Sequence, residues 1–243
     1  MTGATAASPA HDADTLWDLE VLAGARGLGD WMFEQFSPYV GDDVVEVGAG
    51  IGTYSERLLD AGVKRLLAVD PEPPCVQRLR ERFGADARVE VSGDELPGSA
   101  EVRARAGSAD LVLCQNVLEH IDDERGAVAD MAAALKPGGR LLLLVPAGPR
   151  LFGPLDEAYG HHRRYTRDHL RDVVAGASLE VEDLYAFNLL GVPGWWVSNL
   201  RRRKRISPAS VRTYELLLRG WRPIERRFRP RWGLSLIVRA RQK

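Results

Sequence analysis

The chain has 243 residues, of which 45% are hydrophobic and 28% charged, so it can bury a core and intrinsic disorder is excluded for most of it. No apolar run approaches the roughly 18 residues that cross a bilayer, and the N-terminal sequence MTGATAASPAHDAD lacks the basic and apolar parts of a signal peptide. Cys75 and Cys114 are the only cysteines and form no CxxC pair, which argues against a disulfide scaffold and the usual zinc motifs. We therefore expect a cytoplasmic protein without a metal site.

The net charge of −1 hides an uneven distribution of charge along the chain. Residues 201–243 contain 15 basic residues (Lys and Arg) and 2 acidic ones (Asp and Glu). Residues 1–200 contain 18 basic and 32 acidic residues. Four of the six tryptophans also follow residue 190. We therefore expect the last quarter of the chain to have a role of its own.

The sequence pattern of the N-terminal third predicts two helices followed by alternating strands and helices. Residues 12–37 have the pattern of two leading helices, and 43–50 is a β-branched run that ends in glycines. A short helix follows over 53–62, and a second strand over 65–70. The next helix, over 73–84, has prolines in its first turn, where their missing N–H groups are tolerated.

The middle of the chain continues this alternation. Strands are predicted over 87–91, 109–115 and 140–146, and a helix over 122–139 starts with polar residues and stops at Pro-Gly-Gly. Continuous apolar strands separated by helices describe an α/β fold, in which a parallel sheet is covered by helices on both faces.

The C-terminal part predicts a helix over 166–178 and two closing strands over 179–187 and 233–240. The segment 188–232 is too long for a simple connection, so we interpret it as an insertion with its own helices. The predicted organisation has four parts: a helical cap over 1–38, a cofactor-binding core over 39–190, a basic and aromatic helical insertion over 191–232, and a closing strand over 233–243.

A glycine-rich loop between the first strand and its helix is the strongest functional signal. Gly48, Gly50 and Gly52 allow the backbone to approach a ligand closely, and the following helix N-terminus offers free N–H groups. Asp70 ends the second strand, where a carboxylate can accept two hydrogen bonds from a ribose diol. We therefore predict a cofactor that contains a nucleoside, bound at the carboxyl edge of the sheet.

The spacing of this loop departs from the dinucleotide fingerprint. That fingerprint has glycines at relative positions 1, 3 and 6, whereas the sixth position here is Thr53. The loop also begins with Glu46, which would sit poorly beside a pyrophosphate but suits a positively charged cofactor.

Several motifs in this order resemble the class I S-adenosylmethionine-dependent methyltransferases. The sequences VVEVGAGIGTYSERLL, LLAVDP and VEVSGDELP are similar to the first three motifs of that family, and ADLVLCQNVLEHI and LKPGGRLLLLVP to the fourth and fifth. The resemblance covers roughly residues 40–190. It implies a Rossmann-like, seven-stranded, mostly parallel sheet whose last strand is antiparallel, with helices on both faces and a helical insertion before the last strand.

The resemblance also implies roles for residues at the matching positions. The loop residues would line the methionine part of S-adenosylmethionine, with Glu46 orienting the loop. Asp70 would hold the ribose, an acidic pair would meet the adenine edge, and two residues after the fourth strand would lie beside the methyl group. The implied cofactor-binding residues are Glu46, Gly48, Ala49, Gly50, Gly52, Asp70, Asp94, Glu95, Asn116 and Val117. Each has a structural alternative: the glycines can serve turns, Asp70 can cap a helix, and Asp94 can be solvated.

Methyl transfer mainly needs an oriented nucleophile and a group that removes its proton. His120 follows the fourth strand and is a candidate for catalysis or for shaping the site. Residues 153–165, after the fifth strand, resemble a D-x-x-x-G-H-x-R-R-Y stretch of some of these methyltransferases, which makes His161 the leading general base or acceptor-orienting group. His162, Arg164 and Tyr165 are predicted to contact the acceptor. In the alternative, Asp156, His161 and Arg164 form a hydrogen-bonded clasp without proton transfer.

The basic insertion has three interpretations. Val211, Tyr214, Leu217, Leu218 and Trp221 fall on one predicted helical face. This segment could be a lid over the site or a docking face for the acidic part of the chain or a second subunit, as in a homodimer. Alternatively, residues 195–232 could meet an anionic membrane or a lipid-linked glycan. A nucleic-acid partner is not expected, because the sequence pI is about 6.5 and no base-flipping motif is present.

These features together predict an enzyme. We expect a methyltransferase that moves a methyl group from S-adenosylmethionine to oxygen or nitrogen of a small-molecule acceptor. One alternative is methylation of a lipid-linked sugar or another membrane-associated intermediate. A second is a non-catalytic nucleotide-binding module, against which the intact glycine loop and Asp70 argue.

Overall fold

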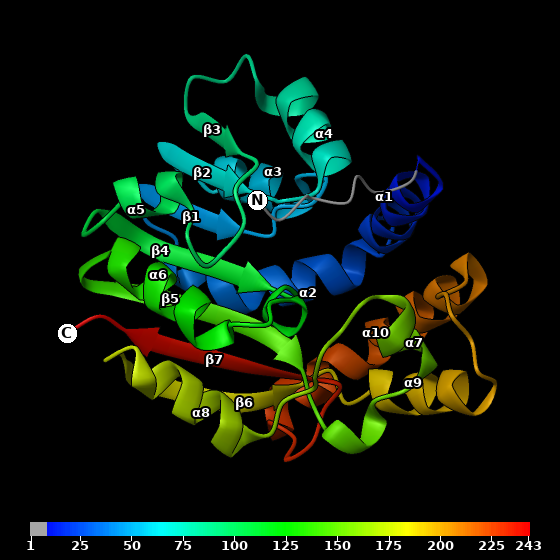
Figure 1. The fold of residues 1–243 in the computed structure, drawn as a ribbon. Coiled ribbons are helices and arrows are strands. Elements are labelled where there is room, and N and C mark those ends of the chain that lie inside the picture. The colour runs from blue at the N-terminus through cyan, green and yellow to red at the C-terminus, as the bar shows by residue number, and fades with distance from the viewer. Residues whose placement is uncertain (1–8) are drawn as a thin grey trace.

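A seven-stranded sheet forms the centre of the computed structural model, which describes residues 9–243 with side chains from residue 16 on. The strands are β1 (Asp43–Val47), β2 (Arg65–Val69), β3 (Val89–Ser92), β4 (Ala109–Gln115), β5 (Leu135–Pro146), β6 (Glu180–Phe187) and β7 (Ser235–Arg241). Their order is β3-β2-β1-β4-β5-β7-β6, and β7 is antiparallel to both neighbours while the other pairs are parallel (Figure 1). The predicted Rossmann-like sheet is confirmed. Residues 1–8 of the predicted cap lie outside the described residues.

Helices cover both faces of the sheet, as predicted. The helices are α1 (Pro9–Ala23), α2 (Arg26–Phe36), α3 (Thr53–Asp60), α4 (Pro73–Phe83), α5 (Ala100–Ala104), α6 (Glu124–Ala134), α7 (Pro154–Ala158), α8 (Arg167–Gly176), α9 (Gly191–Leu200) and α10 (Pro208–Phe228). One layer contains α5, α6 and α8, and the other contains α2, α3 and α4. Of the remaining helices, α7, α9 and α10 gather at the end of the sheet where the parallel strands terminate, and α1 contacts α4 and α10 (Figure 1).

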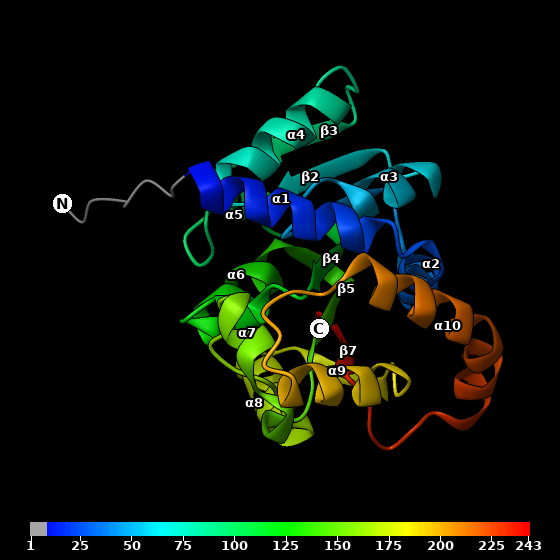
Figure 2. The same ribbon diagram turned by 90° about the vertical axis from the view of Figure 1, so that its right-hand side faces the viewer.

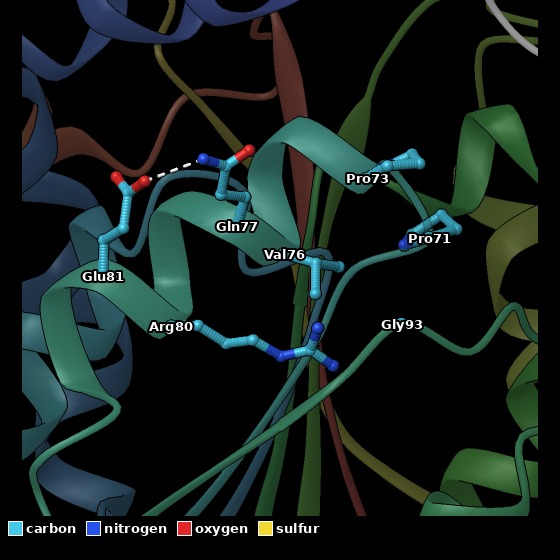
Figure 3. Close-up of a pocket in the computed structure, with 7 residues that line it drawn as sticks. All are labelled: Pro71, Pro73, Val76, Gln77, Arg80, Glu81 and Gly93. Carbon is cyan, nitrogen blue, oxygen red and sulfur yellow. Dashed lines mark hydrogen bonds between the residues drawn. The ribbon is translucent and has the colours of Figure 1, made fainter.

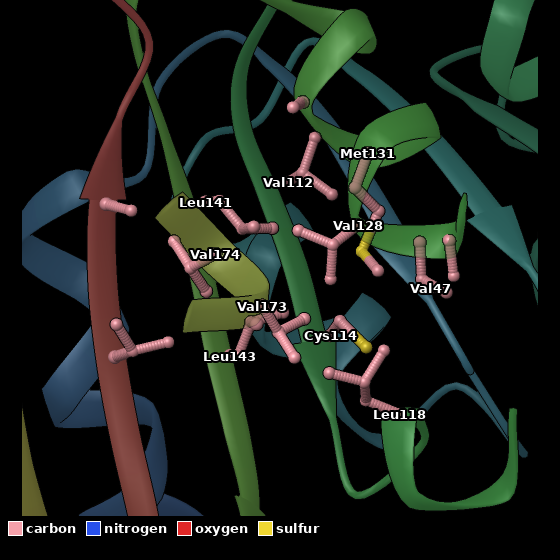
Figure 4. Packing of buried hydrophobic residues seen from close by; sticks show 14 of the residues in the cluster. Val47, Val112, Cys114, Leu118, Val128, Met131, Leu141, Leu143, Val173 and Val174 are labelled. Atoms are coloured by element: carbon pink, nitrogen blue, oxygen red, sulfur yellow. The ribbon is translucent and has the colours of Figure 1, made fainter. Parts of the chain in front are cut away.

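Successive residues of the central strands face opposite layers, because side chains alternate along a strand. Val112 of β4 packs in the cluster that contains Met131 of α6 and Val173 of α8 (Figure 4). Its neighbour Leu113 packs in the other cluster, with Leu58 of α3. The two clusters explain why the strands are apolar throughout, and they hold the carboxyl ends of β1, β2 and β4 in a fixed arrangement.

Two local features differ from the sequence predictions. The helix predicted over 122–139 ends at Ala134, and the strand begins at Leu135, which pairs with Ala109 of β4. Pro137 contributes to this early end, because a residue before proline disfavours helical angles. Helices α5 and α7 were not predicted, since each is only 5 residues long and shows no helical periodicity.

The insertion contains α9 and α10, and α10 packs on α2 of the cap (Figure 2). Glu215 of α10 accepts hydrogen bonds from the backbone N–H groups of Gly27 and Leu28, at 2.8 and 2.9 Å. Leu218 is buried, but Leu217 is 55% exposed, so the predicted apolar face was too wide: Leu217 lies at the side of the buried stripe. Among the described residues, no helix has the length and apolar character needed to cross a membrane.

Candidate active site

The glycine loop turns back on the end of β2. The N–H groups of Gly48 and Ala49 both donate to Val69 O, at 2.8 and 3.0 Å. Gly48, Gly50 and Gly52 have φ angles of 74°, 54° and 80°, in the left-handed region that favours glycine. A Cβ atom at Gly48 would overlap the side chain of Val117. The loop therefore requires glycine for its backbone angles and, at Gly48, for lack of space.

Asp70 lies at the end of β2 and faces the same loop. Its Oδ2 accepts a hydrogen bond from Gly50 N at 2.7 Å, and its Oδ1 accepts one from Glu72 N at 3.0 Å. The residue is 6% exposed, and burial raises the pKa of its carboxyl group. The carboxylate is thus held in place by the backbone, with lone pairs left over for a ligand.

Glu46 lies beneath the loop, inside the protein. Its Oε2 accepts a hydrogen bond from Ser55 Oγ of α3 at 2.6 Å. Burial raises the pKa of Glu46 to about 8. The side chain joins β1 to α3 and supports the loop from below.

The predicted adenine-edge and methyl-edge residues occupy the neighbouring loops. Asp94 Oδ2 accepts a hydrogen bond from Ala100 N at 2.8 Å, so this carboxylate engages the start of α5, while Glu95 is exposed. Asn116 has a φ of 51°, and its N–H donates to Leu144 O at 2.7 Å. Val117, half-buried, is the residue that limits the space at Gly48.

A surface hollow of about 560 Å³ borders this edge of the sheet. It is lined by Pro71, Pro73, Val76, Gln77, Arg80, Glu81 and Gly93, from α4 and the loops after β2 and β3 (Figure 3). Pro71 directly follows Asp70, and Gly93 directly precedes Asp94. The hollow therefore begins at the predicted ribose and adenine positions and extends along α4.

His161 is held by a buried carboxylate. Its Nδ1 lies 2.8 Å from Asp156 Oδ1, and the same oxygen accepts a hydrogen bond from Arg164 Nε at 2.7 Å. The other carboxylate oxygen, Oδ2, accepts one from Gly153 N at 3.0 Å. Arg164, itself 4% exposed, stacks its guanidinium 4.5 Å from the ring centroid of Trp195. The hydrogen-bonded clasp considered as an alternative is present, and it directs Nε2 of His161 away from Asp156.

Glu119 and His120 lie on the other side of His161. Glu119 is completely buried, its two carboxylate oxygens have no hydrogen-bond partner among the described residues, and burial raises its pKa to about 8. Its Oε1 is 3.9 Å from His161 Nε2. The His120 ring meets that of His161 edge to face at 4.8 Å. His120 has an exposed face, but the protein atoms packed around its ring lower its pKa.

The three residues predicted to contact the acceptor, His162, Arg164 and Tyr165, differ in how far they are buried. His162 is exposed, and its backbone N–H donates to Glu119 O at 2.8 Å. Tyr165 is completely buried, and its hydroxyl donates to Glu124 Oε2 at 2.7 Å. Arg164 is buried as well. The structure therefore places Tyr165 and Arg164 beneath the loop, where they support His161, and leaves His162 on the open side.

The sequence profile of a family described as a methyltransferase domain matches residues 26–184, which contain all of these residues except Trp195. The chain belongs to this methyltransferase family. The resemblance to class I methyltransferases is thereby confirmed, and with it the enzyme class and the cofactor, S-adenosylmethionine.

Several known methyltransferases are similar to this chain. The ubiquinone biosynthesis O-methyltransferase of Ralstonia nicotianae is 32% identical over 46% of this chain and 46% of its own length. A probable S-adenosylmethionine-dependent methyltransferase of Mycolicibacterium smegmatis is 29% identical over 59% of this chain and 54% of its own length. The structure of a methyltransferase from Mesorhizobium loti superposes with a TM-score of 0.62 at 15% identity, covering 89% of this chain and 99% of that one. The chain spans about half the length of the curated relatives it matches.

The sequence prediction did not include two residues that the structure brings into the candidate site. Glu119 lies in NVLEHI, directly after the apolar pair Val117 and Leu118, and an acidic residue at that place was a signal of a buried polar site. Trp195 was assigned only to the basic insertion, yet it covers Arg164. No sequence signal could have linked Trp195 to Arg164, because the contact depends on how α9 packs beside α7.

Proposed function

We propose that this protein transfers a methyl group from S-adenosylmethionine to a hydroxyl oxygen of a small organic acceptor. The observation that carries the proposal is the position of the His161 cluster, by which we mean the side chains of Glu119, His120, Asp156, His161 and Arg164. Glu119 and His120 follow Asn116 and Val117 in one short loop, and Val117 packs against Gly48 of the glycine loop. Oxygen is preferred over nitrogen because the Ralstonia nicotianae relative is named as an O-methyltransferase.

The residues around the glycine loop fit the cofactor. A Cβ atom at Gly48 or Gly52 would fill the space against Val117 or Phe83, and Asp70 presents a fixed carboxylate at the edge of the loop. S-adenosylmethionine supplies an electrophilic methyl group on a positively charged sulfonium. We propose that the loop backbone holds its amino acid part and that Asp70 accepts hydrogen bonds from its ribose hydroxyls. The adenine edge would lie near Asp94 and Glu95.

The His161 cluster would position the acceptor and manage its proton. Asp156 fixes the His161 ring through Nδ1, so Nε2 faces the space that Glu119 and His120 share. A ring held in this way loses little orientational freedom when it acts on a substrate hydroxyl. Arg164 and Tyr165 keep the loop in place from inside, and His162 is left to contact the acceptor.

Asp70→Ala tests the cofactor site. The substitution removes the ribose acceptor, so affinity for S-adenosylhomocysteine, measured by calorimetry, should fall by roughly 1–3 kcal/mol. Asp168→Ala is the matched control, because Asp168 is 90% exposed on α8 and should leave the affinity unchanged. If the folded Asp70 variant and the parent protein had equal affinity, the proposed contact between Asp70 and the ribose would be wrong.

A second proposal concerns where the acceptor is found. Exposed apolar side chains gather in the insertion: Trp196, Val197, Leu200, Leu216, Leu217, Ile224, Phe228 and Trp232. The same segment has exposed basic side chains, including Arg201, Arg202 and Lys204. Tryptophan and basic groups together favour the surface of an anionic bilayer. We propose that residues 195–232 bring the enzyme to a membrane that holds its acceptor.

Co-sedimentation with vesicles tests this second proposal. Binding should be stronger to vesicles with anionic lipid than to neutral ones, and it should weaken with salt, since each basic group near the surface contributes about 1 kcal/mol. Replacing Arg201, Arg202 and Lys204 by Gln should reduce the anionic preference without a change in S-adenosylhomocysteine affinity. The absence of such a preference at low salt would leave the insertion as a lid or a contact of a homodimer.

A further inference from the structure

We propose that Glu119, His120 and His161 bind one divalent metal ion beside the methyl-transfer position. The three side chains offer one carboxylate and two imidazoles, with ligand atoms that all lie within 4.8 Å of one another. This donor set is that of catalytic zinc sites and of the two-histidine, one-carboxylate iron sites. The inference rests on the proposed function for its role, but the site is argued from these side chains alone.

Glu119 is the residue whose surroundings indicate a missing ligand. It is completely buried, and both carboxylate oxygens lack a hydrogen-bond partner among the described residues. A buried carboxyl group without a hydrogen-bond partner has a desolvation cost that no hydrogen bond offsets. Glu46, equally buried on the same edge of the sheet, has Ser55 as a partner. A cation between Glu119 and the two imidazoles would supply the missing interaction.

Asp156 orients His161 as a metal ligand. Its carboxylate lies 2.8 Å from Nδ1, so a proton on Nδ1 leaves the Nε2 lone pair free toward Glu119, which is 3.9 Å away. Ligating histidines almost always donate their second ring N–H to a carboxylate or a carbonyl. Arg164 and Gly153 hold Asp156 in turn. Asp156 and His161 are thus held from the core outward, whereas His120 is on the exposed side.

The site would keep an open position for the acceptor. Three protein ligands leave a tetrahedral zinc ion with one free position, as in catalytic sites. His120 has an exposed face, so the site can be reached from outside. Its backbone N–H donates to Val117 O at 2.9 Å, which ties it to the loop beside Gly48. An acceptor bound here would lie next to the sulfonium.

The metal would assist methyl transfer by ionising the acceptor hydroxyl. A hydroxyl oxygen bound to zinc at this site would lose its proton near neutral pH, and the proton would pass to solvent. The oxygen then uses an electron pair to form the new C–O bond as the C–S bond breaks, and the sulfur leaves as a neutral thioether. The bound metal would thus take over the removal of the proton, and His161 would act as a ligand. The expectation of no metal site rested on the absence of a CxxC pair, whereas the ligands proposed here come from two distant segments of the chain.

Zinc titration of the full chain tests the proposal. The protein is freed of any affinity tag, stripped with a chelator and titrated with Zn²⁺ in a calorimeter, without cofactor. We expect one ion per chain. Glu119→Gln, which keeps the shape of the side chain, and His120→Ala should each weaken binding by at least about 100-fold, and Asp156→Asn by roughly 10–100-fold. His169→Ala is the control, since His169 contacts Glu124 outside the cluster and should keep full zinc affinity.

Two outcomes would overturn the proposal. One is the absence of zinc binding by the folded parent protein at millimolar zinc. The other is zinc binding that Glu119→Gln leaves intact, which would indicate a surface site elsewhere. Substitution with Co²⁺ adds a spectroscopic readout, because a tetrahedral ion gives intense visible absorption that Glu119→Gln should abolish. Calorimetry with S-adenosylhomocysteine on the stripped protein keeps the two proposals apart: retained binding of this ligand without zinc binding leaves the proposed function standing.

Discussion

Two buried glutamates on the same edge of the sheet have opposite surroundings. The carboxyl group of Glu46 lies beneath the glycine loop, and that of Glu119 lies in the His161 cluster. Burial raises the pKa of each to about 8. Glu46 accepts a hydrogen bond from Ser55 at 2.6 Å, whereas the oxygens of Glu119 have no partner among the described residues. Similar burial and similar pKa values therefore accompany a hydrogen-bonded glutamate in one case and an unpartnered one in the other.

The difference shows what a raised pKa does and does not reveal. In the glycine-loop region Ser55 donates to Glu46, and Asp70 accepts hydrogen bonds from the backbone N–H groups of Gly50 and Glu72. In the His161 cluster, Asp156 is satisfied by three donors while Glu119 is left over. Unmet hydrogen-bonding capacity, and not burial alone, points to the place where a ligand or an acceptor belongs. Substitutions in the two regions should therefore affect different properties.

The largest effect is expected from His161→Ala. As a base, an orienting group or a metal ligand, His161 acts on the reacting hydroxyl, so turnover should fall by roughly 10²–10⁴-fold. Cofactor affinity should stay unchanged, because the glycine loop is not altered. Methyl transfer to a hydroxylated acceptor and calorimetry with S-adenosylhomocysteine measure the two quantities. Unchanged turnover would exclude His161 from the site, and a loss in KM alone would limit it to orientation.

Glu46→Gln should change how stability depends on pH. The pKa of Glu46 is about 8 in the folded protein, against an ordinary value of 4.5. Between these values the folded state keeps a proton that the unfolded state has released, so the parent protein loses stability as pH rises through this window. The amide oxygen of Gln can still accept the Ser55 hydrogen bond but has no proton to lose. Denaturant unfolding at pH 5, 7 and 9 should therefore give a flatter curve for the variant, by a few kcal/mol across the range. Parallel curves would contradict the buried, protonated carboxyl.

Gly48→Ala should destabilise the protein more than Gly62→Ala. Both residues have positive φ angles, 74° and 96°, so both substitutions introduce backbone strain. Only at Gly48 does the added methyl group overlap Val117, while nothing lies within 4 Å at Gly62. The difference in unfolding free energy should be roughly 1–3 kcal/mol, the usual cost of overpacking. Equal losses for the two variants would mean that the loop has room for a side chain.

The sequence predicted the glycine-loop region better than the His161 cluster. Gly48, Gly50 and Asp70 follow the ends of apolar strands, and parallel strands bring such residues together at one edge. The same logic placed Asn116 and Val117. It could not show that Glu119 would be buried without a partner, since that depends on how residues 153–165 fold over the end of β4 and β5. Nor could it separate the exposed His162 from the buried Arg164 and Tyr165, because loops have no side-chain period.

The smallest effect is expected from Leu19→Ala, which tests how far the glycine-loop region is closed from above. A Cβ atom at Gly50 would lie 3.6 Å from Leu19 Cδ1, so α1 covers the loop (Figure 2). Removal of this half-buried side chain lets water reach the cofactor position, and affinity for S-adenosylhomocysteine should fall by about 1 kcal/mol, or roughly 5-fold. Leu22→Ala is the matched control on the same helix, because Leu22 is 41% exposed and should leave the affinity unchanged. Equal affinities for both variants would mean that α1 lies over the loop without shielding the ligand from water.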